Sequence, residues 1–189
     1  MKEGTNNGCS IQKQAIVSVL IVCVIAVSAI VFVASRIPRI DPTLTDLPVL
    51  AQAIERFESE YGRLPKASAL DFEMEGPEAV KLITVLLGKE QGAQSDMQNP
   101  RQIVFLTGRN TKHKEQGGIV YSSGNKAEGI YDAWGNPVRV ILRPPGKTAI
   151  TLSFRGKQVD FDRSAIALSR GPDQKWGTED DLMSDNEAQ

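Results

Sequence analysis

Cysteine and histidine are nearly absent from this chain of 189 residues, and its formal net charge is only −1. Both cysteines, Cys9 and Cys23, lie near the N-terminus, so the rest of the chain cannot contain a disulfide. The single histidine, His113, stands between two lysines and is expected to be solvated, and neither a catalytic triad nor a zinc site can be built around it. The near-neutral charge provides no overall positive field for nucleic acid, so no nucleic-acid partner is expected.

One long apolar segment runs from Ala15 to Ala34 without a charged residue. At about 1.5 Å per residue it matches the roughly 30 Å hydrocarbon core of a bilayer. We therefore predict a transmembrane helix over residues 15–35, with a cytoplasmic tail over residues 1–14 and the remainder of the chain in the periplasm. A cleaved signal peptide is the alternative, although its apolar region is usually only about 7–15 residues long.

A linker over residues 36–44 is expected next, because prolines there interrupt the helix, and a periplasmic domain over residues 45–189 follows. Thr45 or Asp46 is the expected N-cap of an amphipathic helix with Pro48 in its first turn. Gly62 is expected to end this helix. Its apolar side chains recur at intervals of three and four and form one stripe: Leu47, Leu50, Ile54, Phe57 and Tyr61.

A second helix is expected to open at Gly76-Pro77-Glu78 and to end at Gly88. Its predicted buried side consists of Val80, Ile83, Leu86 and Leu87. The short apolar run 103–106 fits either a strand or an irregular segment of the core.

The C-terminal half has the pattern of β-strands. Three predicted strands, 138–142, 148–154 and 164–168, have short connections, which indicates an antiparallel meander with the amphipathic helix over one face. Trp134, beside a Gly-Asn-Pro turn, is expected to fill the core. The predicted fold class is α+β.

The last predicted strand leads into an acidic loop rich in glycine. The stretch from Gly171 to Gln189 holds six acidic residues and one lysine. Carboxylates at both ends of such a loop repel each other unless a cation closes it, and calcium prefers carboxylate and carbonyl oxygens. The sequence therefore predicts a calcium loop over about residues 168–185, and an unliganded acidic tail is the alternative.

Three motifs in a fixed order carry a family resemblance. Tyr61-Gly-Arg-Leu-Pro65 follows the long helix, Asp132-Ala-Trp-Gly-Asn-Pro137 precedes the first strand of the expected meander, and Ser169-Arg-Gly-Pro-Asp173 leads to Asp180-Asp181. From about residue 45 onward the chain resembles the major pseudopilin of type II secretion, within the type IV pilin-like superfamily. The resemblance implies a non-enzymatic subunit of the inner membrane that assembles with other pseudopilin subunits and with secretion components.

The same resemblance implies the ligands of a calcium ion (Ca2+). Matching positions give Asp173 and Asp181 as the principal side-chain ligands, Asp180 next, and the carbonyl of Arg170 as an early backbone ligand. Glu179 and Asp185 are weaker candidates.

The N-terminus departs from the family pattern. The family has a Gly-Phe cleavage site and a glutamate at the fifth mature position, and this chain has neither. Cleavage at Gly8 would make Cys9 the first residue and Lys13 the fifth, which reverses the charge there. A membrane-anchored adaptor or binding module that keeps the fold without forming filaments is therefore the alternative function.

A hydrolase with paired carboxylates is a third possibility. It is disfavoured because the carboxylates belong to one short loop with no opposing acid on a strand.

Overall fold

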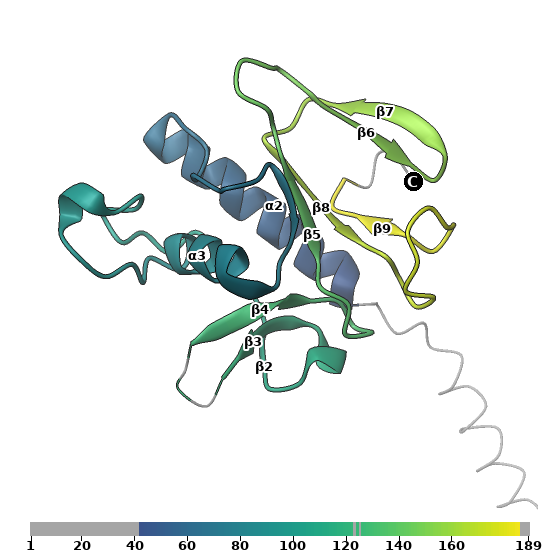
Figure 1. Cartoon of the computed structure of the whole chain (residues 1–189), viewed down its shortest axis with the longest axis horizontal. Helices are drawn as coiled ribbons and strands as arrows, with labels where there is room; N and C mark the ends of the chain where they lie inside the picture. Colours follow the sequence, from purple (N-terminus) through teal and green to yellow (C-terminus); the bar gives the residue numbers. More distant parts are fainter. Residues whose placement is uncertain (1–41, 123, 125, 186–189) are drawn as a thin grey trace, which may run out of the picture. The chain divides into compact units, whose positions relative to one another are not determined.

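The computed structural model of this protein describes residues 42–122, 124 and 126–185. The predicted tail (1–14), the predicted transmembrane helix (15–35) and most of the predicted linker lie outside these residues. Within the described part of the chain, no helix is both long enough and apolar enough to cross a membrane. The described residues form an α+β unit of two α-helices and mainly antiparallel strands (Figure 1).

Helix α2 (Pro42–Tyr61) begins earlier than predicted. The expected start at Thr45 or Asp46 was wrong, and Pro48 lies inside the helix instead of in its first turn. The side chain of Asp46 makes a tertiary contact, since Arg109 Nη2 donates to its Oδ2 at 2.9 Å.

The predicted apolar stripe of α2 is confirmed. Leu47, Leu50, Ile54 and Phe57 are at most 1% exposed and form the centre of the main core. Gly62 follows the helix with a φ of +65°, and its N–H donates to the carbonyl of Glu58 at 2.7 Å. The helix therefore ends where the glycine predicts.

Helix α3 (Gly76–Leu86) confirms the second predicted helix. Ile83 and Leu86 are buried as expected, whereas Val80 and Leu87 are only half-buried. The remaining buried residues of the helix are Ala79, Leu82 and Val85. Gly88 has a φ of +63°, and a Cβ atom there would lie 2.5 Å from the carbonyl oxygen of Gln102, so only glycine fits at this helix end.

The run 103–106 is an irregular core segment, one of the two alternatives left open. Phe105 and Leu106 are buried, and both of their N–H groups donate to the carbonyl of Leu86, at 2.8 and 3.0 Å. This segment therefore satisfies a carbonyl in the last turn of α3 that has no partner within the helix.

The predicted meander was wrong in its pairing. β5 (Arg139–Leu142) pairs with β8 (Ala165–Ser169), and these two central strands are flanked by β1 (Asp71–Glu73) and β9 (Leu182–Met183) in an antiparallel sheet.

A separate hairpin lies between β5 and β8 in the sequence. It is formed by β6 (Ile150–Phe154) and β7 (Lys157–Phe161), and β7 falls in a segment that was expected only to connect two strands. Arg155 and Gly156 have φ values of +48° and +76°, typical of the two-residue turn that matches the twist of a hairpin. β6 therefore pairs with its nearest neighbour, which leaves β8 as the partner of β5.

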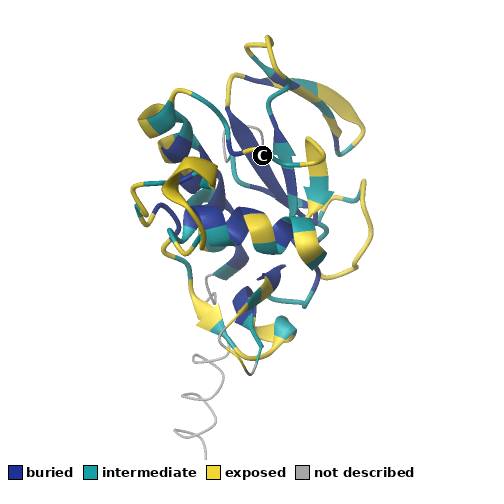
Figure 2. Ribbon diagram, turned by 60° about the vertical axis from the view of Figure 1, so that its left-hand side comes forward, coloured by how far each residue is buried: buried dark blue, intermediate teal, exposed yellow. Residues whose placement is uncertain are grey.

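Strand β8 is buried along its whole length and on both faces (Figure 2). Ala165 and Ala167 belong to the main core with α2, while Ile166 and Leu168 pack in a second cluster with apolar residues of the hairpin. Small side chains on one face let the helix approach closely, and large ones on the other fill the space beneath the hairpin. The helix thus covers one face of the sheet, as expected.

A second sheet was not predicted. It comprises β2 (Asn110–Thr111), β3 (Gly118–Tyr121) and β4 (Ala127–Tyr131), with β2 parallel and β4 antiparallel to β3. Two short 3₁₀ turns, Gln94–Asp96 and Lys114–Gln116, lie in the connecting segments. His113 is exposed next to the second of these turns, as expected.

Asn99 generates a first prediction because it is fully buried and joins three segments. Its Nδ2 donates to the carbonyls of Val85 and Ile103, and its Oδ1 accepts from Tyr61 Oη at 2.7 Å. Asn99→Ala leaves these buried groups unpaired and should lower the free energy of unfolding by about 2–4 kcal/mol in urea titrations.

The exposed Gln91 provides the control for this prediction, and Gln91→Ala should change the free energy of unfolding by less than about 0.5 kcal/mol. Tyr61→Phe combined with Asn99→Ala should cost less than the two single changes added together. Strict additivity would contradict the shared network.

Candidate metal-binding loop

The acidic loop connects β8 to β9 and is closed by the sheet itself. Ser169 at the end of β8 pairs with Leu182 at the start of β9, so the loop begins and ends at the same edge of the sheet. Gly171 has a φ of +61°, and a Cβ atom there would lie 2.3 Å from the carbonyl oxygen of Asp180. Glycine is therefore required where the two ends of the loop cross.

The three predicted carboxylates, Asp173, Asp180 and Asp181, lie in one loop whose backbone connects two of them. The N–H of Asp173 donates to Asp180 Oδ2 at 3.0 Å, and Thr178 Oγ1 donates to Asp180 Oδ1 at 2.5 Å. The N–H of Gly177 donates to Asp181 Oδ2 at 2.7 Å. Backbone and hydroxyl donors thus hold two of the carboxylates in place within one turn of the loop.

Asp181 is the most unusual of the three because it is only 2% exposed. Its Oδ1 is buried and has no hydrogen-bond partner among the described residues. Burial raises the pKa of this carboxyl above its ordinary value, and the negative charges of Asp180 and Asp173 add to the effect. Burial therefore disfavours the ionised form of Asp181, and a nearby cation would stabilise it.

The pKa of Asp180 is shifted in the opposite direction. The hydrogen bond from Thr178, followed by the N–H of Asp173, lowers the pKa of its carboxyl. Asp180 thus stays ionised next to the buried Asp181, and the two carboxylates repel each other unless a cation screens them.

The other predicted ligands have different positions. Glu179 is exposed, and Asp185 lies beyond β9, where Arg163 Nε donates to its Oδ2 at 3.2 Å. The guanidinium of Arg170 donates to Glu73 Oε1 at 2.6 Å. The carbonyl of Arg170 remains a predicted ligand at the start of the loop.

Sequence reasoning missed Asp132, which forms the base of the loop. This carboxylate is fully buried and accepts from the N–H groups of Trp134 and Asn136, from Asn136 Nδ2 and from Ser169 Oγ, at 2.6–2.9 Å. Asn136 Nδ2 also donates to the carbonyl of Gly171 at 2.9 Å. Asp132 therefore ties the turn at 132–137 to the first residues of the acidic loop.

Trp134 is half-buried, so the expectation that it fills the core was wrong. Its backbone N–H, which donates to Asp132 Oδ1 at 2.9 Å, is the part that holds the turn. An aspartate at the start of a turn often accepts a hydrogen bond from the backbone N–H two residues later. The sequence Asp-Ala-Trp-Gly at 132–135 already contained this signal.

Arg155, also missed, reaches the loop from the tip of the β6–β7 hairpin. Its Nη2 donates to the carbonyl of Asp181 at 2.6 Å, and its positive charge helps to lower the pKa of Asp180. A fixed guanidinium therefore supplies part of the positive charge that the carboxylates require.

Trp176 holds the outer part of the loop to the sheet. The guanidinium groups of Arg139 and Arg170 lie 5.4 and 5.6 Å from its ring centroid. Arg139 is itself paired with Asp71, and Arg170 with Glu73. Each contact of this kind contributes about 0.5–1 kcal/mol at an exposed site, so the indole anchors the loop to β1 and β5.

The oxygen atoms of the loop suit a hard cation, but its side chains alone do not complete a coordination shell. In the described ranges, no group of three histidine, cysteine, aspartate or glutamate side chains is placed to hold a metal ion. The unpartnered Oδ1 of Asp181 is nevertheless an oxygen that a cation would satisfy. A calcium ion here would take its further ligands from backbone carbonyls, a hydroxyl or water.

No family model, curated protein or solved structure matches this chain.

The base of the loop generates the second prediction. Asp132→Asn replaces an acceptor oxygen by an NH₂ group that faces other donors, and it should lower the free energy of unfolding by about 2–4 kcal/mol. Asp162→Asn makes the same chemical change at an exposed position and should cost less than about 0.5 kcal/mol. Equal midpoints for the two variants in urea would show that Asp132 does not hold the loop.

Proposed function

We propose that this chain is a membrane-anchored structural subunit of a type II secretion-type or type IV pilus-like assembly, and that calcium stabilises its C-terminal loop. The anchor is the apolar segment at residues 15–35, the N-terminus is cytoplasmic, and the α+β domain lies in the periplasm at the inner membrane. The protein acts through assembly with other pilin-like subunits and has no catalytic role.

The observation that carries the calcium part of the proposal is the buried carboxylate of Asp181. Its Oδ1 has no partner among the described residues, while Asp173 and Asp180 lie close enough to raise its pKa. Nothing after Cys23 can form a disulfide, so the closing of this loop depends on non-covalent contacts. A bound cation offsets the repulsion and satisfies the buried oxygen at the same time.

Two further features support the pilin-like part of the proposal. The long helix α2 packs its apolar stripe on an antiparallel sheet, and the acidic loop connects β8 to β9 of that sheet. The motifs at 132–137 and 169–173, which are far apart in sequence, join through Asp132, Asn136 and Gly171. Because the two motifs contact each other directly, both stabilise the same loop.

The alternative is a non-filamentous adaptor with the same fold. Lys13 favours it, because a lysine at the expected fifth position cannot neutralise the terminal amine of a neighbouring subunit. The sequence of the mature N-terminus and the contacts between neighbouring apolar segments separate the two functions.

Calcium should raise the melting temperature of the full-length protein in detergent. At a concentration of 100 times Kd the ion adds about 2.7 kcal/mol, which corresponds to about 5–10 °C for a protein of this size. Asp181→Asn should abolish this increment and, in chelator, be at least as stable as the parent, because it removes a buried charge. Scanning calorimetry with calcium and with chelator measures both effects.

The matched control is Glu179→Gln, a charge removal at an exposed position of the same loop that should keep the calcium response. A parent protein whose melting temperature ignores both calcium and chelator would refute the calcium site. A response that survives in Asp181→Asn would place the ion elsewhere.

Filament assembly predicts contacts between copies in the membrane. Single cysteines placed from Ile16 to Phe32, in a Cys9→Ser and Cys23→Ser background, should cross-link neighbouring copies with the periodicity of one helix face. Mass spectrometry of the N-terminus, which tests for cleavage at Gly8, accompanies the measurement. Absence of cross-links at every position in native membranes would favour the adaptor.

A further inference from the structure

A groove of about 540 Å³ lies at the end of β5 remote from the acidic loop. One wall is the segment Leu64–Leu70, which follows α2, and the other is the turn Pro144–Lys147. The floor is formed by Leu142 and by Arg143 with Glu58. Its apolar lining includes Leu70, which is 41% exposed, and the exposed Pro145.

Both walls are held rigidly. Gln98 donates to the carbonyl of Lys66 at 3.2 Å and accepts from its N–H at 2.5 Å, and the N–H of Leu142 donates to the carbonyl of Leu70 at 2.7 Å. In the opposite wall, Lys147 N–H donates to the carbonyl of Pro144 at 3.1 Å across Pro145 and Gly146, whose φ is +75°. A preformed groove lowers the entropic cost of binding.

The charges on the floor are used internally. Arg143 donates to Glu58 at 2.5 Å and to Ser164 at 3.3 Å, and Ser164 also donates to Glu58. The nearby Glu78 accepts from Ser68. The carboxylates beside this groove therefore already have partners.

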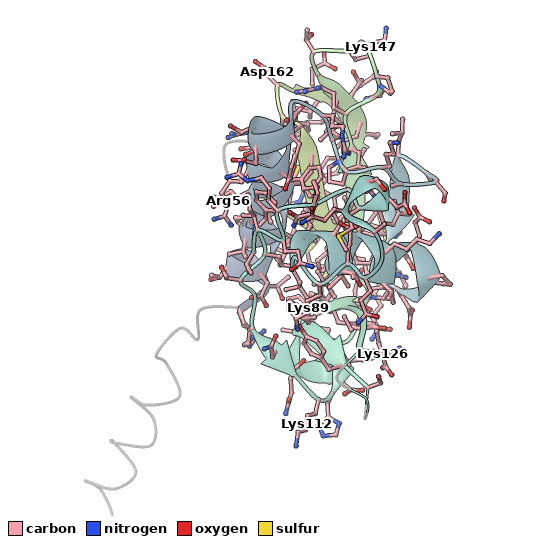
Figure 3. All side chains as sticks on the ribbon, turned by 90° about the vertical axis from the view of Figure 1, so that its left-hand side faces the viewer. Arg56, Lys89, Lys112, Lys126, Lys147 and Asp162 are labelled. Atoms are coloured by element: carbon pink, nitrogen blue, oxygen red, sulfur yellow. The ribbon has the colours of Figure 1, made fainter. Side chains whose placement is uncertain are left out.

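Two lysines on the rim are left without such partners. Lys66 and Lys147 stand on opposite walls, are exposed, and have no side-chain hydrogen bond or ion pair among the described residues. Lys147 extends from one end of the domain (Figure 3). The groove thus presents apolar walls between two free positive charges.

We propose that this groove binds an extended segment of a partner protein in which aliphatic side chains alternate with acidic ones. Aliphatic side chains fill the space between the two walls, and carboxylates reach Lys66 and Lys147. Complementary charge then selects acidic segments, while burial of the apolar side chains supplies most of the affinity. This binding depends on neither calcium nor assembly of the chain.

The probe is a fluorescein-labelled octapeptide of alternating leucine and glutamate, and fluorescence anisotropy measures its binding to the full chain in uncharged detergent. Two further peptides replace every glutamate by lysine or every leucine by serine. The leucine–glutamate peptide should bind, and the other two should bind at least tenfold more weakly. Equal binding of all three, or no binding of the first, would overturn the proposal.

The charge-reversed variant is Lys66→Glu combined with Lys147→Glu. Both side chains are exposed and unpaired, so the variant should fold, and it should weaken binding about tenfold or more. Leu70→Ser, which leaves the rim charges in place, should also weaken it.

The matched control is Lys112→Glu combined with Lys126→Glu, the same change in net charge elsewhere on the surface, with Lys112 at the end opposite Lys147 (Figure 3). It should bind the peptide like the parent. An equal loss in the control would reduce the effect to net charge and overturn the proposal. Retention by phosphatidylglycerol-doped micelles that needs Lys66 and Lys147, without peptide binding, would assign the groove to lipid instead.

Discussion

The burial of strand β8 on both faces is the constraint on which the rest of the domain depends. A strand with only one buried face would need one partner layer, but β8 needs two. Helix α2 covers the alanine face, and the β6–β7 hairpin covers the face of Ile166 and Leu168. The hairpin therefore cannot continue the sheet, and β5 takes the place beside β8 that a simple meander would give to a neighbour in sequence.

The position of the acidic loop follows from the same strand. β8 ends at Ser169, a fully buried residue whose hydroxyl donates to the equally buried Asp132. The hairpin that covers β8 also carries Arg155 to the carbonyl of Asp181. The loop is thus contacted both by the turn at 132–137 and by the hairpin tip, and both contacts depend on the packing of β8.

Residues with strong local rules were predictable from the sequence. The stripe of α2 and the helix ends at Gly62 and Gly88 follow from periodicity and from the conformational freedom of glycine, and both were confirmed. The acidic loop itself was predictable because Gly171 and Gly177 interrupt a stretch of carboxylates, and its role as a cation site stays a prediction. The partner of β5 was not predictable, because strand pairing over a long sequence distance depends on which faces are buried, and the polar β7 gave little sign of a strand.

The network around Asp132 shows why a site is harder to predict than a helix. Each of its four donors is ordinary by itself, and only the fold brings Ser169 next to Asn136.

The two ends of β5 differ in the contacts that stabilise them. At one end, Arg139 contacts Trp176 of the acidic loop. Beyond Leu142, the walls of the groove are fixed by Gln98 and by a proline–glycine turn that needs no ion. The two proposed sites therefore lie at opposite ends of β5 and depend on different contacts, so a change in the acidic loop leaves the hydrogen bonds of the groove walls in place.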